Sequence, residues 1–368
     1  MSDPKAITMR DLARLASCSA NTISLALRDS PRLNSETRAR IQELARRHGY
    51  RINPLVSAFV QSRGAPMPTQ TIALLTKFAS ADDRQTSSTV FTLELLAGMA
   101  ARAAEIGFLL EEFSTALPGA PDSERLNQIL IARGIRGVIL VPSGSLAQSF
   151  PALDWRHFSV VAAGFHARQW PVHRVALDQA RSVELCLEQL TLRGYQRIGL
   201  AVTRDQDPRT NYTAAGAFLS WQLRQPERNR IPFIPVDHYY VPSDALEAWI
   251  LEHRPEAVIF NDIPSIDSID SINTRHGLNV IPLAINFVER PGLGGVVPGV
   301  AQLGKTSVSV LARELYLNHY GFPELPEVTL VCGQWREGER LRRLVPIDPS
   351  EQMRIHPSPT PLPSSPLS

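Results

Sequence analysis

Apolar residues recur at helical spacing three times in the first 48 residues. The first pattern covers residues 8–16 and the second covers 20–27. The third opens at Asn34 or Ser35 and stops before Gly49. Polar residues at 17–19 interrupt the first pattern, and Pro31 disfavours helix just before itself. The pattern predicts three short helices, the first two joined by a tight turn, as in an all-α helix-turn-helix head.

From residue 71 short runs of branched apolar residues alternate with amphipathic helical stretches. Such alternation predicts an α/β domain with parallel sheets wound through right-handed crossovers. About 230 residues of this pattern favour two sheets rather than one, and ligands bind such sheets at the carboxyl ends of the strands. The predicted strands are 72–75, 108–113, 137–141, 159–163, 197–202, 256–260 and 280–287, and the predicted helices are 92–106, 122–133, 179–193, 210–224, 243–252 and 300–318.

Charge is distributed unevenly along the 368 residues, although the net charge is only +2. Residues 1–63 hold 11 Lys or Arg against 5 Asp or Glu, a balance of +6, and the remainder holds 27 against 31, a balance of −4. A small basic segment before a mildly acidic body is typical of a chain whose first part meets a polyanion. A basic surface of no functional meaning would give the same count.

The cysteines and the lack of targeting segments indicate the cellular compartment of the protein. Cys18, Cys186 and Cys332 are far apart and lack metal-type spacing, which favours reduced, buried thiols. The start MSDPKAIT is not a signal peptide, and no apolar run approaches the ~18 residues of a membrane helix. We therefore expect a cytoplasmic protein without a cofactor or bound metal.

The first 60 residues resemble the DNA-binding head of the lactose repressor family of bacterial regulators. Many positions agree in register: Thr8, Asp11, Leu12, Ala13 and Ala16, then Ser19, Thr22, Ile23, Ser24 and Leu27, then Ser35–Arg38 and the run Gly49–Pro54. The family usually has glycine then valine in the turn, where this chain has Ser17 and Cys18. Serine tolerates a positive φ less well than glycine, so we expect slight strain there.

The resemblance implies that the second helix lies in the major groove with its first residues on base edges. Asn21 is suited to pair with adenine, while Ala20 and Leu25 offer apolar contact to a thymine methyl. Ser19, Thr22 and Ser24 are suited to phosphate contacts, which position the head without reading sequence. Thr8, a predicted helix cap, and Asn53 complete the matched DNA-binding positions. Three packed helices with an ordinary polar surface are the alternative.

Residues 53–60 resemble the family's hinge helix, which presses an apolar side chain into the minor groove. The pattern Asn-Pro, any residue, Ala, two residues, Leu is only approximately matched, and Phe59 takes the position of the wedge. A phenylalanine wedge between base steps is physically reasonable. A hydrophobic contact inside a dimer is the alternative role for Phe59.

Residues 71–346 resemble the family's effector-binding part, which is itself similar to periplasmic sugar-binding proteins. The match is clearest at 135–142, 175–178, 194–199 and 333–338. It implies a periplasmic-binding-protein-like domain of two doubly wound parallel-sheet subdomains, a homodimer, and a small-molecule effector. The expected domains are 1–52 for the head, 53–69 for the hinge and linker, 70–346 for effector binding, and a disordered proline-rich tail at 347–368. The two subdomains are expected at 70–172 plus 296–323 and at 173–295 plus 324–346.

Effector candidates come from the strand ends. They are Thr76, Lys77 and Phe91 around the first strand, Ser143 after the third, Asn261 and Asp262 after 257–260, and Asn286, where relatives often place an Asp. The family favours an arginine three residues before a glycine-aromatic pair. Here Thr213 holds that position, and Arg209 is one helical turn earlier, which makes a simple sugar less well suited. A surface or capping role is the alternative for each residue.

Two other function classes were weighed. An enzyme needs a catalytic or nucleotide-binding motif, and none of G-x-G-x-x-G after a strand, the P-loop or G-x-S-x-G is present. The spacing of His157, His166 and His173 fits no common metal motif. A pure binding protein, in particular a cytosolic sensor with a degenerate head, would explain residues 71–346 but not the head. The sequence therefore predicts a DNA-binding transcription regulator, most simply a repressor, under the control of an effector.

Overall fold

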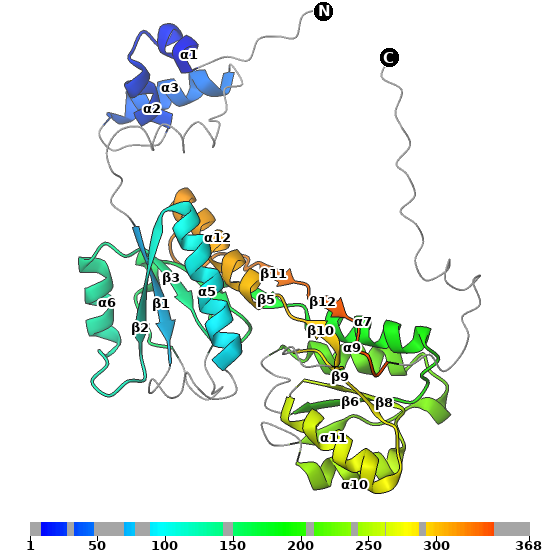
Figure 1. Cartoon of the computed structure of the whole chain (residues 1–368). Helices are drawn as coiled ribbons and strands as arrows, with labels where there is room; N and C mark the ends of the chain where they lie inside the picture. Colours follow the sequence, from blue (N-terminus) through cyan, green and yellow to red (C-terminus); the bar gives the residue numbers. More distant parts are fainter. Residues whose placement is uncertain are drawn as a thin grey trace, which may run out of the picture. The chain divides into compact units, whose positions relative to one another are not determined.

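The computed structural model describes residues 9–27, 33–47, 70–77, 89–142, 150–203, 210–236, 242–261, 263–286 and 292–341. The chain divides into two compact units, Met1–Thr69 and Gln70–Ser368, and each is described by itself (Figure 1).

The first unit contains the three predicted helices, α1 (Met9–Leu15), α2 (Ala20–Leu27) and α3 (Ser35–Arg47). Each helix contributes apolar residues to one small core, formed by Leu12, Ala16, Ile23, Ala26, Ile41 and Ala45. The Gln42 side-chain amide on α3 donates to the Ala26 carbonyl oxygen at 3.0 Å. This bond satisfies a carbonyl in the last turn of α2, where no helical partner is available, and so fixes α2 against α3.

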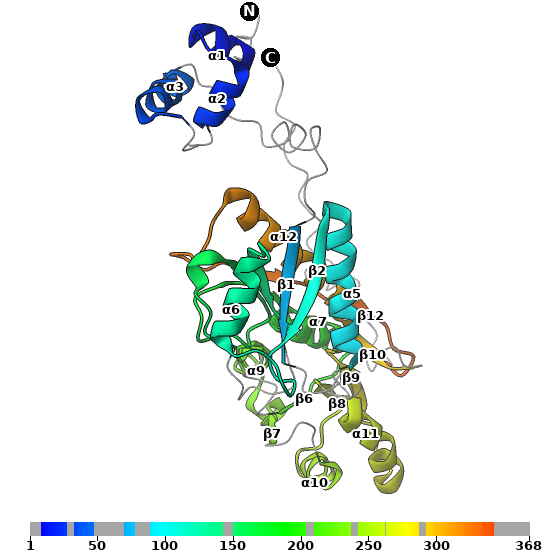
Figure 2. The same cartoon turned by 90° about the vertical axis from the view of Figure 1, so that its left-hand side faces the viewer.

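The first sheet of the second unit has the order β11-β5-β4-β3-β1-β2 and is parallel throughout. Its strands are β1 (Gln70–Thr76), β2 (Phe108–Ser114), β3 (Gly137–Leu140), β4 (Ser159–Ala163), β5 (His173–Leu177) and β11 (Val328–Val331). The helices α5 (Thr89–Ile106) and α12 (Val300–Leu317) cover one face, and α6 (Ser123–Ala132) lies on the other side, as Figures 1 and 2 both show.

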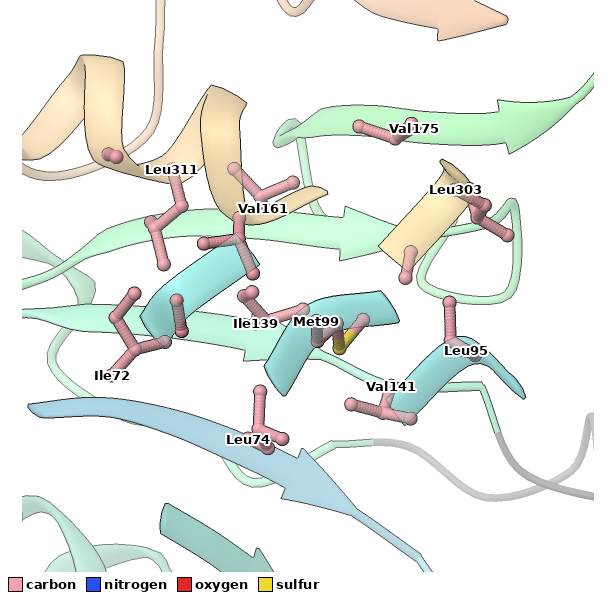
Figure 3. Close-up of a cluster of buried hydrophobic side chains, with 14 of the residues drawn as sticks. Ile72, Leu74, Leu95, Met99, Ile139, Val141, Val161, Val175, Leu303 and Leu311 are labelled. Atoms are coloured by element: carbon pink, nitrogen blue, oxygen red, sulfur yellow. The ribbon is translucent and has the colours of Figure 1, made fainter. Parts of the chain in front are cut away.

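Strand residues of this sheet alternate between two cores. On β1, Ile72 and Leu74 face the core shared with α5 and α12 (Figure 3), whereas Ala73 and Leu75 face the core shared with α6. Both faces are buried, which explains why the strands read as continuous apolar runs.

The second sheet has the order β12-β10-β9-β8-β6-β7. Its strands are β6 (Ile198–Thr203), β7 (Ile234–Val236), β8 (Ala257–Phe260), β9 (Ile281–Ala284), β10 (Gly294–Val297) and β12 (Gln334–Arg336), of which β12 is antiparallel to β10. The helices α7 (Gln179–Leu192) and α9 (Thr213–Gln222) pack on one face, and α10 (Ser243–His253) and α11 (Ile263–His276) pack on the other (Figure 1). The predicted fold class, a helical head with two doubly wound sheets, is confirmed.

Three crossings join the two sheets. They follow β5, β10 and β11, near Asp178, at 298–299 and at 332–333. The expected divisions between the subdomains were 172/173, 295/296 and 323/324. The crossings lie later because β5 and β11 add to the first sheet before the chain leaves it, and β10 adds to the second. These short strands lie beside the crossings, where pattern alone gives little indication of which sheet they join.

The contact between α5 and α12 is unusually close. A Cβ on Gly304 would lie 2.2 Å from the Leu95 carbonyl oxygen, and one on Gly98 would lie 2.1 Å from that of Ala301. Glycine is therefore required at both positions for the two backbones to approach this closely.

Candidate functional site

The turn between α1 and α2 ends the first helix through a left-handed residue. Ser17 has a φ of 51°, as the comparison of serine with glycine anticipated. The Cys18 amide donates to the Ala13 carbonyl oxygen at 3.0 Å, and the Ser17 amide donates to that of Arg14 at 3.3 Å. This pair of bonds is the Schellman arrangement that glycine normally permits. A serine thus occupies the left-handed position in the turn where slight strain was predicted.

Ser19 caps the helix that follows this turn. Its Oγ accepts from the Thr22 amide at 3.1 Å, and the two hydroxyl oxygens are 2.9 Å apart. The cap supplies a partner to an amide in the first turn of α2 that has none within the helix. Ser19 is exposed and Thr22 is half-buried. The same serine that starts the helix is thus placed at the surface beside its amino end.

The predicted base-reading positions occupy this helix. Ala20 and Asn21 are its first two residues, and the half-buried Leu25 is in its second turn. Ser24 also lies on α2, but the side chains of Ala20, Asn21 and Ser24 are outside the described part of the head.

Six further predicted site residues lie outside the described residues. They are Thr8, Asn53 and Phe59 of the DNA-binding set and Ser143, Arg209 and Asp262 of the effector set. Their roles stay predictions.

The carboxyl ends of both sheets face the region where the chain crosses between them. β5 and β11 leave the first sheet at their carboxyl ends, and β10 leaves the second sheet in the same sense. The strands paired with them in parallel register therefore also point their carboxyl ends toward the crossings. Since ligands bind such sheets beyond these ends, the residues that follow β1, β8 and β9 are the relevant ones.

Three side-chain amides meet there in the second sheet. Asn261 follows β8, Asn286 follows β9, and Gln179 begins α7 directly after the crossing from β5. The Gln179 Nε2 donates to Asn286 Oδ1 at 3.2 Å, and Asn286 Nδ2 donates to the Asn261 carbonyl oxygen at 3.2 Å and to its Oδ1. We call Gln179, Asn286 and Asn261 the amide chain. The structure thus brings together two predicted residues and adds Gln179, which sequence reasoning missed.

Both ends of the amide chain have unused hydrogen-bonding atoms. The Asn261 Nδ2 and the Gln179 Oε1 are buried and have no hydrogen-bond partner. Leaving a buried donor or acceptor without a partner costs about 1–3 kcal/mol. One free donor and one free acceptor are the complement of a hydroxyl group, which both accepts and donates.

Lys77 follows β1 and is the most unusual polar residue at the ends of the first sheet. Only 6% of it is exposed, and its Nζ has no hydrogen-bond partner. The ammonium lies 4.7 Å from the centroid of the Phe150 ring, and no ion pair with Lys77 is found in the described part of the chain. Burial lowers its pKa from 10.5 to about 8, because an ammonium without its hydration is disfavoured.

The remaining predicted effector residues have structural contacts. The Thr76 hydroxyl is buried and donates to Glu112 Oε1 on β2 at 2.8 Å. Phe91, in the first turn of α5, packs partly against the hydrophobic core. Thr213 is the first residue of α9, and its hydroxyl donates to the Thr210 carbonyl oxygen at 2.7 Å. In the described part of the chain no hydrogen bond joins Thr213 to the amide chain, so its role at a ligand stays a prediction.

The described residues include no group of three or more His, Cys, Asp or Glu that is arranged to hold a metal ion. No helix among them is both long and apolar enough to cross a membrane. Cys186 is buried as expected, but the expectation of buried thiols is wrong for Cys332, which is exposed where the chain crosses between the sheets.

The head matches a known family. Residues 8–53 match the family model described as bacterial regulatory proteins, lacI family. The match covers α1, α2 and α3 and agrees with the resemblance and the helix-turn-helix pattern predicted for this segment.

Solved structures show the same fold over nearly the whole chain. The transcriptional regulator CelR in complex with cellobiose is 16% identical, with a TM-score of 0.52, and the match covers 91% of this chain and 99% of CelR. The Lac repressor dimer bound to operator and the anti-inducer ONPF is 16% identical, with a TM-score of 0.50 and the same coverage. The Lac repressor bound to ONPG is 15% identical, with a TM-score of 0.51 over 92% of this chain and 100% of that one. A comparison with curated proteins found no match.

Proposed function

We propose that this chain is a lacI-family transcription regulator that binds an inverted-repeat operator as a homodimer and represses transcription there, under the control of a small polar effector. The observation that supports the proposal most is the capped helix α2, held after a tight turn within the residues that match the family. One reading helix per chain suits a two-fold operator. A Lac repressor dimer bound to operator has the same fold.

Residues of the head divide into those that read bases and those that position the head. Asn21 pairs with adenine, and Ala20 and Leu25 contact thymine methyl groups. Thr8, Ser19, Thr22, Ser24 and Asn53 contact phosphates or complete the helix ends. Phe59 inserts into the minor groove and bends the duplex. The exposed Ser19 supports this division, because its Oγ marks the amino end of α2 at the surface.

The effector binds between the carboxyl ends of the two sheets. The amide chain, with Asp262 beside it, takes the hydroxyl groups of the ligand, and Thr76, Lys77, Phe91, Ser143, Arg209 and Thr213 complete the set of contacts. The unused atoms of Asn261 and Gln179 support a hydroxylated ligand, and CelR, whose structure contains cellobiose, has the same fold. A ligand that contacts both sheets shifts their relative orientation and couples to DNA affinity. Such coupling is about 1–3 kcal/mol.

Regulation rather than catalysis is the proposed role of the second unit as well. We propose no enzymatic activity, no cofactor and a cytoplasmic location, since the DNA that the head reads is there. We also propose that the head ends at residue 52, the hinge and linker at residue 69, and the effector-binding domain with its two subdomains at residue 346, after which the terminal tail follows.

The experiment is an operator-binding titration with and without ligands. A duplex selected from a random pool is bound by the full chain, and sugars, sugar acids, sugar phosphates and nucleobases are added in turn. An effector moves the binding curve, and Asp262→Ala abolishes both its binding and the shift. A ligand that still binds to the variant refutes the site, and a ligand that binds without moving the curve refutes the coupling. Sedimentation that shows a monomer at micromolar concentration on and off DNA excludes the dimer.

A further inference from the structure

The cation at the end of β1 lacks the partner that buried charges in folded proteins normally have. Lys77 is nine-tenths buried, and its Nζ has neither a hydrogen-bond partner nor an ion pair within 4 Å in the described part of the chain. The Phe150 ring gives it a cation–π contact at 4.7 Å, which does not neutralise the charge. A lysine is almost never buried in this way unless its ammonium has an ion-pair or hydrogen-bond partner.

The described groups around Lys77 do not supply that partner. Glu112 lies on β2, the strand paired with β1, and its Oε1 accepts from the hydroxyl of Thr76. His166 follows β4, and its ring centroid lies 5.4 Å from that of Phe150, the ring that contacts Lys77. Neither forms a hydrogen bond with the Lys77 ammonium. Desolvation by burial lowers the pKa of Lys77, and no carboxylate among the described residues pairs with its ammonium.

Two strands of the second sheet end in neutral amides in the described part of the chain, Asn261 after β8 and Asn286 after β9, whereas the carboxylate of Asp262 is assigned to ligand hydroxyl groups in the proposed function. The family resemblance implies an Asp at the position of Asn286. An amide in place of a carboxylate removes a negative charge that would repel an anion. The free donor of Asn261 and free acceptor of Gln179 match hydroxyl groups.

We infer that the effector is a hydroxylated anion, with its carboxylate or phosphate on Lys77 and its hydroxyl groups on the amide chain. This inference rests on the proposed function, because it names the chemical class of the ligand for the same site. It explains why a buried ammonium without an ion pair is retained at a strand end that faces the crossing region. It also agrees with Thr213 in place of the family's arginine, since the positive charge is supplied instead from the first sheet.

Calorimetry on the full chain tests the inference with matched ligands. For each of glucose, galactose, xylose and ribose, the free sugar, its aldonate and its terminal phosphate are compared, with inorganic phosphate as the minimal anion. Aldonates and phosphates are separate arms, so the source of the charge is identified. We expect an anionic member to bind more tightly than its neutral counterpart. We also expect binding about tenfold weaker at pH 9 than at pH 7, because Lys77, with a pKa of about 8, loses its proton in between.

Two variants and a control make the result decisive. Lys77→Met is expected to weaken the anion about 10- to 100-fold at pH 7 and to remove the dependence on pH, while raising Tm without ligand. Asn261→Ala weakens the same ligand through its hydroxyl groups. Lys305→Met, on α12, is the matched control and is expected to change neither the affinity for the anion nor its dependence on pH.

The outcomes separate this inference from the proposed function. If a neutral sugar binds, moves the operator curve and binds Lys77→Met as tightly as wild type, the regulator stands and the anion is wrong. If no aldonate or phosphate binds, the inference is overturned whether or not a neutral sugar binds. If an anion binds through Lys77 but does not move the operator curve, the chemical class inferred for the ligand of this site stands and the coupling in the proposed function fails.

Discussion

Replacing Lys77 with methionine should stabilise the second unit, and by an amount that depends on pH. The lysine is 6% exposed, and its pKa is lowered from 10.5 to about 8 by burial alone. That difference corresponds to about 3 kcal/mol of unfavourable free energy for the charged side chain. Because the folded pKa lies below the unfolded one, the folded state binds fewer protons. The destabilisation of the folded state by Lys77 is therefore at its maximum below pH 8 and disappears as the pH rises toward 10.5.

Methionine keeps an unbranched stem of similar length and removes the charge. We expect the free energy of unfolding of Lys77→Met to exceed that of wild type by about 3 kcal/mol at pH 7 and by about 2 kcal/mol at pH 9. Urea unfolding followed by tryptophan fluorescence measures this, because all five tryptophans lie in residues 155–335 and none in the head. Lys305→Met in parallel removes a lysine from α12 and should show no such dependence on pH. A variant less stable than wild type, or a difference that is constant from pH 7 to 9, would refute the reasoning.

The remaining predictions concern the head and the closest helix contact. Ser17→Gly should stabilise the head by up to about 1 kcal/mol, because glycine relieves the left-handed φ of 51°; slower hydrogen exchange of the α2 amides would show it, and unchanged exchange would count against it. Gly304→Ala should lower the free energy of unfolding by at least about 2 kcal/mol, since its Cβ would meet a carbonyl oxygen at 2.2 Å. Gly216→Ala, whose Cβ meets nothing within 4 Å, should leave that free energy unchanged or raise it in the same urea assay. Equal effects of the two variants would contradict the close packing. Phe59→Ala should reduce DNA bending in a gel assay and leave the dimer intact, and unchanged bending would exclude the wedge.

The strands buried on both faces were predictable because their pattern is continuous. On β3, for example, Val138 and Leu140 enter one core and Ile139 enters the other, so nearly every position is apolar. The short strands beside the crossings were not predicted. β10 begins with two glycines and β11 is partly exposed at a sheet edge, so neither carries a clear apolar signal. The place of β11 in the first sheet depends on pairing with β5, which is remote in sequence, and that of β10 in the second sheet depends on pairing with β9.

The candidate site shows a similar division. Asn261 and Asn286 were predictable, because each follows a strand whose carboxyl end must face the crossings. Gln179 was missed since it opens a helix, and only the capping residue Asp178 before it marks the position. The burial of Lys77 depends on Phe150, which belongs to the segment after β3. Contacts of this kind arise from packing between distant segments and leave no local pattern.

The proposed function requires that the head reads DNA sequence through α2. Selection of duplexes from a random pool by the full chain tests it most directly, followed by binding of the selected duplex and a scrambled one at several salt concentrations. We expect an inverted repeat, affinity that falls steeply with salt, and a loss of about 1–3 kcal/mol for Asn21→Ala on the selected duplex with little change on the scrambled one. Enrichment of no sequence, or an equal loss on both duplexes, would contradict the account.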